Sequence, residues 1–516
     1  LTLLSILSTP ARAVVFSVVR GIVHDPAHRP VPGVEVTLKS QHSDYTQTLR
    51  TRDDGAFEFS SVPAGEYTIR VQRAGFAEEE QPLIAASGTA PIMHFQLRLA
   101  QQSESVVVSE SQDAVDTGSM TPTTLVDRDK IDRTPGANLS NSLNMITDYV
   151  PGAYITHDQL HVRGGHQVTW AIDGVPIPNT NIASNVGPQI DPKDIDTLEI
   201  QRGGYSADYG DRTYGLFNVV PRTGFERNGQ MELNTTYGTF QQTNDQINFG
   251  NHSERLAYFG SINGNRSNYG LETPGPEVSH DRVWGLGGFG SVIFNPDAAN
   301  QLRFVTSVRR DDFQIPIDPF ATDTMLRDVE RERDVVSTFT WAHTFSPGLF
   351  LTTSPFVHVN RANYDGDPNS TPISTVQHLD STYAGAQMTL SAINDRHNAR
   401  AGIYGFGQHD YEFIHLIGNN GSGDNVTAGK PSSGDLEAAF LEDQFKVTRW
   451  LTLTGGVRLT HFSGAVSENS ADPRVGAAIR IPRLNWVLRG FYGRYYQAPP
   501  LSTVSGPLLD YALVQG

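Results

Sequence analysis

The stretch from 451 to 459 reads LTLTGGVRL, and its residues alternate between two kinds. Odd positions hold leucine, glycine and valine, whereas even positions hold threonine, glycine and arginine. Successive side chains of a β-strand point to opposite faces, so this alternation predicts a strand with one apolar and one polar face. The segments 231–237, 338–345 and 384–391 show the same division. The C-terminal half of the chain is therefore expected to consist mainly of strands.

Alternation alone does not separate a strand that faces a protein core from one that faces lipid. Strand length does, because strands of soluble proteins cluster near about 5–6 residues, whereas a tilted membrane strand needs about 9–11. The longer requirement is met by 282–294, 333–345, 348–360 and 449–462. Aromatic residues near the strand ends suit the interfacial girdles of a membrane barrel; they are Trp284, Trp341, Phe345, Trp450, Phe462 and Trp486. We expect an antiparallel transmembrane β-barrel over 225–516.

The connections between these strands predict the orientation of the barrel. The segments 361–378 and 414–434 are rich in Asp, Asn, Gly, Pro and Ser and are expected to be long outer loops. The short connections at 345–349 and 446–451 are expected to be inner turns.

The composition excludes several classes of protein. The 516 residues carry 56 Asp and Glu against 39 Lys and Arg, and the net charge of −17 argues against a nucleic-acid partner. The chain has no cysteine, which excludes disulfides, thiolate zinc sites and thiol nucleophiles. No stretch approaches the roughly 18–20 apolar residues of a spanning helix. Only strands could take this chain across a bilayer.

The N-terminal region predicts an exported protein that begins with a small β-domain. An apolar run at 3–7, followed by Ala11 and Ala13, is typical of the end of a signal peptide, so 1–13 are interpreted as its remnant. An ordinary apolar strand is the alternative. Short alternating runs separated by turn signals predict a β-sandwich over 14–100, and the polar segment 101–125 is expected to be a linker.

Four motifs in the first domain resemble the carboxypeptidase regulatory-like β-sandwich. They lie at 21–26, 31–34, 53–57 and 63–67. The resemblance implies no catalysis, because this sandwich is not the catalytic domain of a carboxypeptidase.

Six short motifs then follow in an order that resembles the plug of TonB-dependent outer-membrane receptors. They lie at 139–143, 149–154, 162–165, 171–176, 195–203 and 209–210, within a plug domain predicted over 126–224. Two barrel segments, 472–476 and 492–500, also look like segments of this family. The order of the domains, with a sandwich before the plug, resembles that of receptors of the Oar type. The family implies 22 strands, and about 13 can be drawn here, so the C-terminal part of the barrel is expected to lie beyond 516.

The resemblance implies roles for several residues of the plug and barrel. Arg163 and Arg202 match plug arginines that pair with barrel carboxylates in the family, and Glu437 and Glu442 are candidate partners. The alternative for each arginine is a solvated surface position. The remaining plug-motif residues are expected to be mainly conformational; they are Gly164, Gly165, Asp173, Gly174, Gly203, Tyr209 and Gly210. Pro221 departs from the family pattern, because proline cannot donate to a central strand ladder.

The family also implies two contact regions. Its TonB box, an extended segment that adds a strand to a periplasmic partner, would lie at Glu104, Ser105, Val106, Val107 and Val108. The alternative for this segment is the last strand of the sandwich. Ligand contacts are expected at the plug tips, about 176–188 and 205–213, where Asn179, Asn181 and Asn185 could bind a sugar or peptide.

No catalytic or metal-binding motif stands out. The sequence holds no nucleophile elbow, P-loop or zinc-protease motif, and its 16 histidines lack metal-ligand spacing. We expect no cofactor and no enzyme activity; a hydrolase is the least favoured interpretation. The resemblance implies an outer-membrane importer of a glycan, peptide or siderophore, driven by a TonB-type protein and surrounded by outer-membrane lipid. The alternative is a surface or secreted β-rich glycan-binding adhesion protein.

Overall fold

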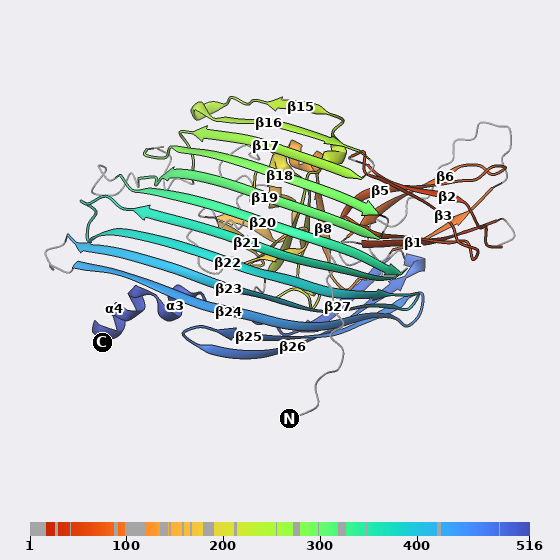
Figure 1. Ribbon diagram of the computed structural model, residues 1–516. Coiled ribbons are helices and arrows are strands. Elements are labelled where there is room, and N and C mark those ends of the chain that lie inside the picture. Colours follow the sequence, from red (N-terminus) through yellow and green to blue (C-terminus); the bar gives the residue numbers. More distant parts are fainter. Residues whose placement is uncertain are drawn as a thin grey trace.

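The chain folds into three β-rich units in a computed structural model (Figure 1). The structure describes residues 17–25, 29–41, 43–86, 91–98, 119–134, 143, 146–156, 159–165, 168–178, 190–210, 214–253, 255–271, 279–297, 299–317, 327–346, 348–419, 425–484 and 486–515. The predicted mainly β architecture, with a sandwich, a plug and a large antiparallel sheet, is confirmed.

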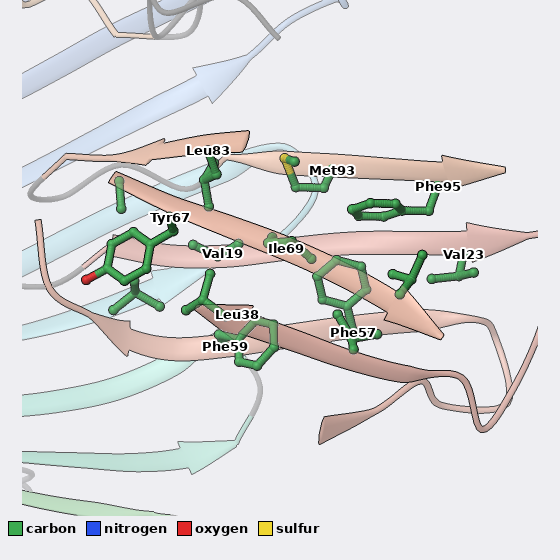
Figure 2. Packing of buried hydrophobic residues seen from close by; sticks show 14 of the residues in the cluster. Val19, Val23, Leu38, Phe57, Phe59, Tyr67, Ile69, Leu83, Met93 and Phe95 are labelled. Atoms are coloured by element: carbon green, nitrogen blue, oxygen red, sulfur yellow. The ribbon is translucent and has the colours of Figure 1, made fainter. Parts of the chain in front are cut away.

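The first unit is a β-sandwich of two small sheets. Its strands are β1 (Ser17–His24), β2 (Glu35–Ser40), β3 (Thr46–Arg50), β4 (Ala56–Val62), β5 (Gly65–Gln72), β6 (Glu79–Ala85) and β7 (Ile92–Gln96). They form sheets in the orders β4-β1-β7 and β3-β2-β5-β6. Alternate residues such as Leu38, Phe57, Ile69 and Phe95 point inward and form the core between the sheets (Figure 2).

The second unit is the plug, which is built on a five-stranded sheet of order β12-β11-β14-β13-β8. Its elements are β8 (Thr123–Asp127), α1 (Arg128–Arg133), η1 (Ile146–Tyr149), β9 (Ala153–Thr156), β10 (Gln159–Val162), β11 (Val168–Ile172), β12 (Val175–Ile177), η2 (Pro192–Asp194), β13 (Ile195–Gln201) and β14 (Gly215–Pro221). Pro221 ends β14 opposite Ile195, beside a register irregularity in that pair. The strand tolerates the proline because it is the last residue of β14, and the next backbone N–H, that of Arg222, still donates to the carbonyl oxygen of Asp194 at 2.9 Å.

The third unit is a single antiparallel sheet of thirteen strands in sequence order. They are β15 (Gln230–Asn234), β16 (Thr243–His252), β17 (Leu256–Ser267), β18 (Val283–Asp297), β19 (Asn300–Gln314), β20 (Val329–Ser346), β21 (Leu349–Asp365), β22 (Ile373–Ile393), β23 (His397–Gly418), β24 (Asn425–Lys446), β25 (Leu451–Ser463), β26 (Ser467–Ile481) and β27 (Trp486–Gly493). Short helices accompany them: η3 (Gly224–Glu226), η4 (Thr239–Gln241), η5 (Pro482–Leu484), α3 (Leu501–Ser505) and α4 (Pro507–Gln515). The sheet curves around the plug (Figure 1).

No helix in the described part of the chain is long and apolar enough to cross a membrane.

The two faces of the large sheet differ in the way expected of a membrane barrel. Along β25, the polar residues Thr452, Thr454 and Arg458 are buried against the interior, whereas Leu453 and Leu459 are 43% and 53% exposed on the outside. An apolar face turned outward is the reverse of a soluble sheet, whose apolar face is its core. The alternation at 451–459 therefore places its leucines on an outward-facing apolar surface.

Two details of the predicted barrel are wrong. Phe462 was expected in an aromatic girdle, but it is an even-numbered residue of β25 and lies buried inside. The segments 361–378 and 414–434 were expected to be loops, but β21, β22, β23 and β24 extend far into them. These strands reach 17 to 22 residues, and parts that extend beyond the bilayer need no apolar face.

The sandwich contacts the end of the barrel that carries the short turns. Phe225, which precedes β15, joins the core of the sandwich and packs its ring 5.3 Å from that of Tyr45. Arg20 donates a hydrogen bond to the carbonyl oxygen of Asn394 at 2.8 Å, and Glu58 accepts one from the backbone N–H of Gly348. The sandwich is therefore held at the rim opposite the longer connections.

Candidate functional site: the plug and its contacts with the barrel

A plug loop between β13 and β14 lies deep against the barrel wall. The described part of this loop includes Gly203 and Gly204, whose φ angles of 76° and 64° favour glycine. The next residues turn inward, and Tyr205, Ala207 and Asp208 are at most 2% exposed. The plug loop 203–210 thus exposes several backbone groups to the barrel interior.

Three barrel arginines hold this loop; we call Arg400, Arg458 and Arg474 the arginine clamp. Arg474 donates to the carbonyl oxygens of Tyr205, at 3.2 Å, and of Ser206. Arg458 donates to the carbonyl oxygens of Asp208 at 3.0 Å and of Ala207 at 3.4 Å. All three guanidinium groups are at least 95% buried.

Side-chain contacts complete the clamp. Arg400 donates to the hydroxyl of Ser206 at 3.2 Å and lies 3.8 Å from the Asp208 carboxylate. Glu442, on the neighbouring strand, accepts a hydrogen bond of 2.8 Å from the backbone N–H of Ala207. Charges of both signs therefore meet the loop, as buried charges require for compensation.

The clamp arginines also pack closely against aromatic rings and against the backbone of the plug loop. The guanidinium of Arg474 lies 4.5 Å from the ring centre of Tyr495 and 5.7 Å from that of Tyr205. A Cβ atom at Gly210 would come within 2.5 Å of the Nε atom of Arg458. Glycine at this position therefore permits a close approach between plug and barrel.

A second contact is a buried ion pair between Asp173 of the plug and Arg303 of β19. The Nε and Oδ2 atoms are 2.6 Å apart, and both side chains are at most 4% exposed. Asp173 lies in the turn between β11 and β12, and its backbone N–H donates to the carbonyl oxygen of Val219. Burial raises the pKa of Asp173 to about 6, against the opposing effect of Arg303.

A third contact surrounds Asp194 in η2. Its Oδ1 atom accepts hydrogen bonds from Ser261, at 2.6 Å, and from Gln246, at 3.0 Å, both on barrel strands. Burial and the nearby carboxylate of Asp191 raise the pKa of Asp194 to about 7. These three polar contacts help to fix the plug to the barrel, and in two of them burial raises the pKa of a plug carboxylate, Asp173 or Asp194.

Each of the three structural units matches a known protein family. Residues 18–98 match the carboxypeptidase regulatory-like domain, residues 116–215 match the TonB-dependent receptor plug domain, and residues 319–512 match the TonB-dependent receptor-like β-barrel. The chain is a member of the TonB-dependent receptor family. Barrels of this family lie in the outer membrane, in accord with the apolar outer face.

Individual relatives share the fold at low sequence identity. The TonB-dependent transporter Oar of Myxococcus xanthus is 24% identical over 284 residues, which are 53% of this chain and 26% of that protein. The ferric citrate transporter FecA has 14% identity and a TM-score of 0.60, covering 77% of this chain and 66% of FecA. The ferric-catecholate receptor Fiu of E. coli K12 has 15% identity and a TM-score of 0.56, covering 74% and 71%. The chain spans about a quarter of the Oar relative that it matches.

The structure of this TonB-dependent receptor separates the four predicted ion-pair residues. Glu442 faces the plug and contacts Ala207. Glu437 as a plug partner is wrong, because it lies on the exposed outer face of β24, where residues of odd number point away from the plug. Arg163 is exposed on the plug, and Arg202 donates to the carbonyl oxygen of Pro151 at 3.0 Å. In the described residues, neither arginine pairs with a barrel carboxylate.

The positive charges at the contact between plug and barrel lie on the barrel, whereas they were expected on the plug. The barrel supplies the arginines, and the plug supplies carbonyl oxygens and carboxylates. Sequence inspection missed Arg303, Arg400, Arg458 and Arg474, although a signal was present: Arg458 is the one charged residue on the polar face of 451–459. A charged residue on that face has to meet something polar inside the barrel.

The remaining predicted residues divide into two groups. In the described part, Gly164, Gly174 and Gly203 have positive φ angles, and Tyr209 is buried. Gly165 lies against the ring of Tyr214. The tip 205–213 was expected to face ligand, but its described residues, 205–210, lie buried beside the arginine clamp. The TonB-box candidates 104–108 and the residues Asn179, Asn181 and Asn185 lie outside the described residues.

We predict that acid tightens the plug in the barrel. A carboxylate whose pKa is raised on docking stabilises the docked state below its ordinary pKa, and this contribution is lost as the pH rises through the raised value. For Asp194 the window runs from its ordinary value of 3.8 to about 7, and the full change is up to about 4 kcal/mol. Urea-dependent protease cleavage of the plug should therefore need more urea at pH 5 than at pH 8.

The variant Asp194→Asn checks this prediction. An asparagine oxygen can still accept from Ser261 and Gln246 but does not ionise, so only the smaller dependence from Asp173 should remain. Asp129→Asn, at an exposed position on α1, is the matched control and should keep the full dependence. An Asp194→Asn profile identical to that of the control would contradict the assignment.

Proposed function

We propose that the chain belongs to an outer-membrane receptor that imports a ligand by moving its plug, with energy from a TonB-type protein. The observation that carries this proposal is the way in which the plug is held. Its contacts with the barrel include buried hydrogen bonds and ion pairs to Arg303, Arg400, Arg458 and Arg474, and such contacts can exchange for water when the plug moves. A purely apolar interface would offer no such exchange.

The ligand is proposed to be a glycan, a peptide or a siderophore. The named structural relatives include receptors for ferric citrate and for ferric catecholates, and these names support a small chelate as one candidate class. The N-terminal sandwich, shared with the regulatory-like family, accords with the Oar-like subclass. We propose no enzyme activity and no cofactor for this chain.

We propose that the segment Glu104–Val108 contacts the TonB-type partner by adding a strand to its sheet. The test uses the full-length protein in detergent and the periplasmic domain of the host's TonB-type protein. Val107→Pro removes a backbone donor, so the dissociation constant should rise about tenfold or more. Val107→Thr keeps the donor and the β-propensity and should bind as the parent does.

Cell fractionation tests the proposal as a whole. An outer-membrane protein with a heat-modifiable band, whose uptake of a screened ligand falls in Val107→Pro while ligand binding persists, is the expected result. A full-length protein found soluble without detergent would overturn it and favour the surface or secreted glycan-binding alternative. Equal partner binding by both Val107 variants would remove the proposed box and leave the barrel assignment intact.

A further inference from the structure

A row of arginines crosses the outer face of the barrel near its longer connections. Arg310 of β19 lies directly opposite Arg333 of β20, which lies directly opposite Arg361 of β21. Arg333 and Arg361 are exposed, and the Arg310 side chain is 41% exposed. Like charges directly opposite one another destabilise a sheet. The fold by itself gives no reason for this row.

Neighbouring acids neutralise only part of the row. Arg310 pairs with Asp312 at 2.7 Å, and Arg361 lies 3.7 Å from Asp380. Arg333 forms no ion pair with any residue that the structure describes. In a chain of net charge −17, an outward guanidinium without an acid partner leaves a local excess of positive charge.

The same region forms a recess on the outer wall. Its volume is about 400 Å³, and we call it the arginine recess. Its lining consists of three arginines, one acid, two aromatic rings, a histidine and an asparagine: Arg331, Arg333, Arg361, Asp380, Tyr411, Phe413, His378 and Asn363. These residues lie on four adjacent strands, β20 to β23. The recess therefore combines three guanidinium groups and two aromatic rings with one carboxylate, that of Asp380, which pairs with Arg361.

The recess lies at the upper boundary of the apolar band. One step toward the short turns, Val308, Val335 and Val359 form a second direct cross-strand row. From Arg310 to Asn300, β19 runs for ten residues, or about 33 Å of strand at about 3.3 Å per residue. A tilt of about 40° reduces this length to a height of about 25 Å, the height of a lipid-facing band. The arginine row therefore lies at the level of lipid headgroups.

We propose that the arginine recess binds the phosphate of a phosphorylated glycolipid in the outer leaflet of the membrane. Guanidinium groups bind phosphate through paired, charge-assisted hydrogen bonds, and Arg333 and Arg361 face each other across adjacent strands. The acyl chains would lie on the valine row below, and Tyr411 and Phe413 have the aromatic character favoured at a membrane interface. This site lies on the outer wall and is independent of ligand import through the barrel.

Native mass spectrometry of the full-length protein in detergent tests the proposal, with diphosphorylated lipid A as the probe. The Arg333→Gln/Arg361→Gln variant should bind this lipid about tenfold or more weakly, as expected for two lost charge-assisted contacts. The control Arg396→Gln/Arg449→Gln changes two exposed arginines at the opposite rim and should bind as the parent does. Dephosphorylated lipid A should bind the parent no better than diphosphorylated lipid A binds the recess variant.

Two outcomes would overturn the proposal. Equal lipid binding by the recess variant and the rim control would show that the recess does not select phosphate. If inorganic phosphate bound the recess with the same dependence on the arginines and lipid A did not, the occupant would be a free anion. Heat-modifiable mobility confirms that each variant is folded before binding is compared.

Discussion

Replacing Arg303 with methionine is expected to destabilise the docking of the plug by about 3–5 kcal/mol, the usual cost of leaving one member of a buried ion pair alone. The physical reason is that Asp173 would remain buried at 4% exposure with no cation beside it. Methionine fills much of the same volume, so the loss would come from charge and not from a cavity. Hydrogen exchange at the backbone amide of Asp173, which donates to Val219, should accelerate more than 100-fold.

A second substitution in the same ion pair tests whether the lost stability comes from the unpaired charge. Asp173→Asn added to Arg303→Met removes the lone charge and should recover most of the lost stability. Arg449→Met, at an exposed rim position, is the control and should leave exchange unchanged. If Arg303→Met behaves like this control, the ion pair does not secure the plug.

The second large effect is expected from the arginine clamp. Arg458→Met combined with Arg474→Met removes the guanidinium donors to four consecutive carbonyl oxygens, those of residues 205–208. Each buried acceptor left without a partner costs about 1–3 kcal/mol. The loop 203–210 should therefore open locally, and hydrogen exchange within it should accelerate more than 100-fold while the barrel strands remain protected.

Arg480→Met supplies a matched control for the clamp. Arg480 lies on β26, as Arg474 does, but it is exposed near the short-turn end. It should leave exchange in the loop unchanged. In whole cells, the double clamp variant should also admit large antibiotics more readily than the Arg480→Met variant, because a loosened plug blocks the lumen less well. Loss of protection across the barrel strands would instead indicate global unfolding and would contradict a local clamp.

The two predicted barrel partners of the plug, Glu437 and Glu442, show that the sequence does not reveal which face of a strand points inward. Glu437 and Glu442 are five positions apart on one strand, so they lie on opposite faces, and only one of them can face the plug. That parity was available from the sequence, but the choice of inner face was not, because soluble and membrane strands alternate alike. The exposure of Leu441 and the burial of Glu442 identify the inner face.

The sequence also predicted the wrong donors for the plug contacts. Motif resemblance assigned the positive charge to Arg163 and Arg202 of the plug, whereas the structure places buried arginines on the barrel. A motif records the residues of one segment, but an ion pair depends on both segments that meet. Arg458 was visible as a charge on the polar face of its strand, and nothing in the sequence named its partner.

What the sequence determined by itself was the kind and order of the units: a sandwich, a plug, and long amphipathic strands. Period-two alternation, turn residues and family motifs are local properties, and neighbouring residues suffice to express them. The tertiary structure alone decided how the plug is held. Ala207 and Glu442 are separated by 235 positions, and they meet because the register of successive strands and the curvature of the sheet bring β24 against the plug loop. Register and curvature depend on all the strands together, so no single segment encodes that contact.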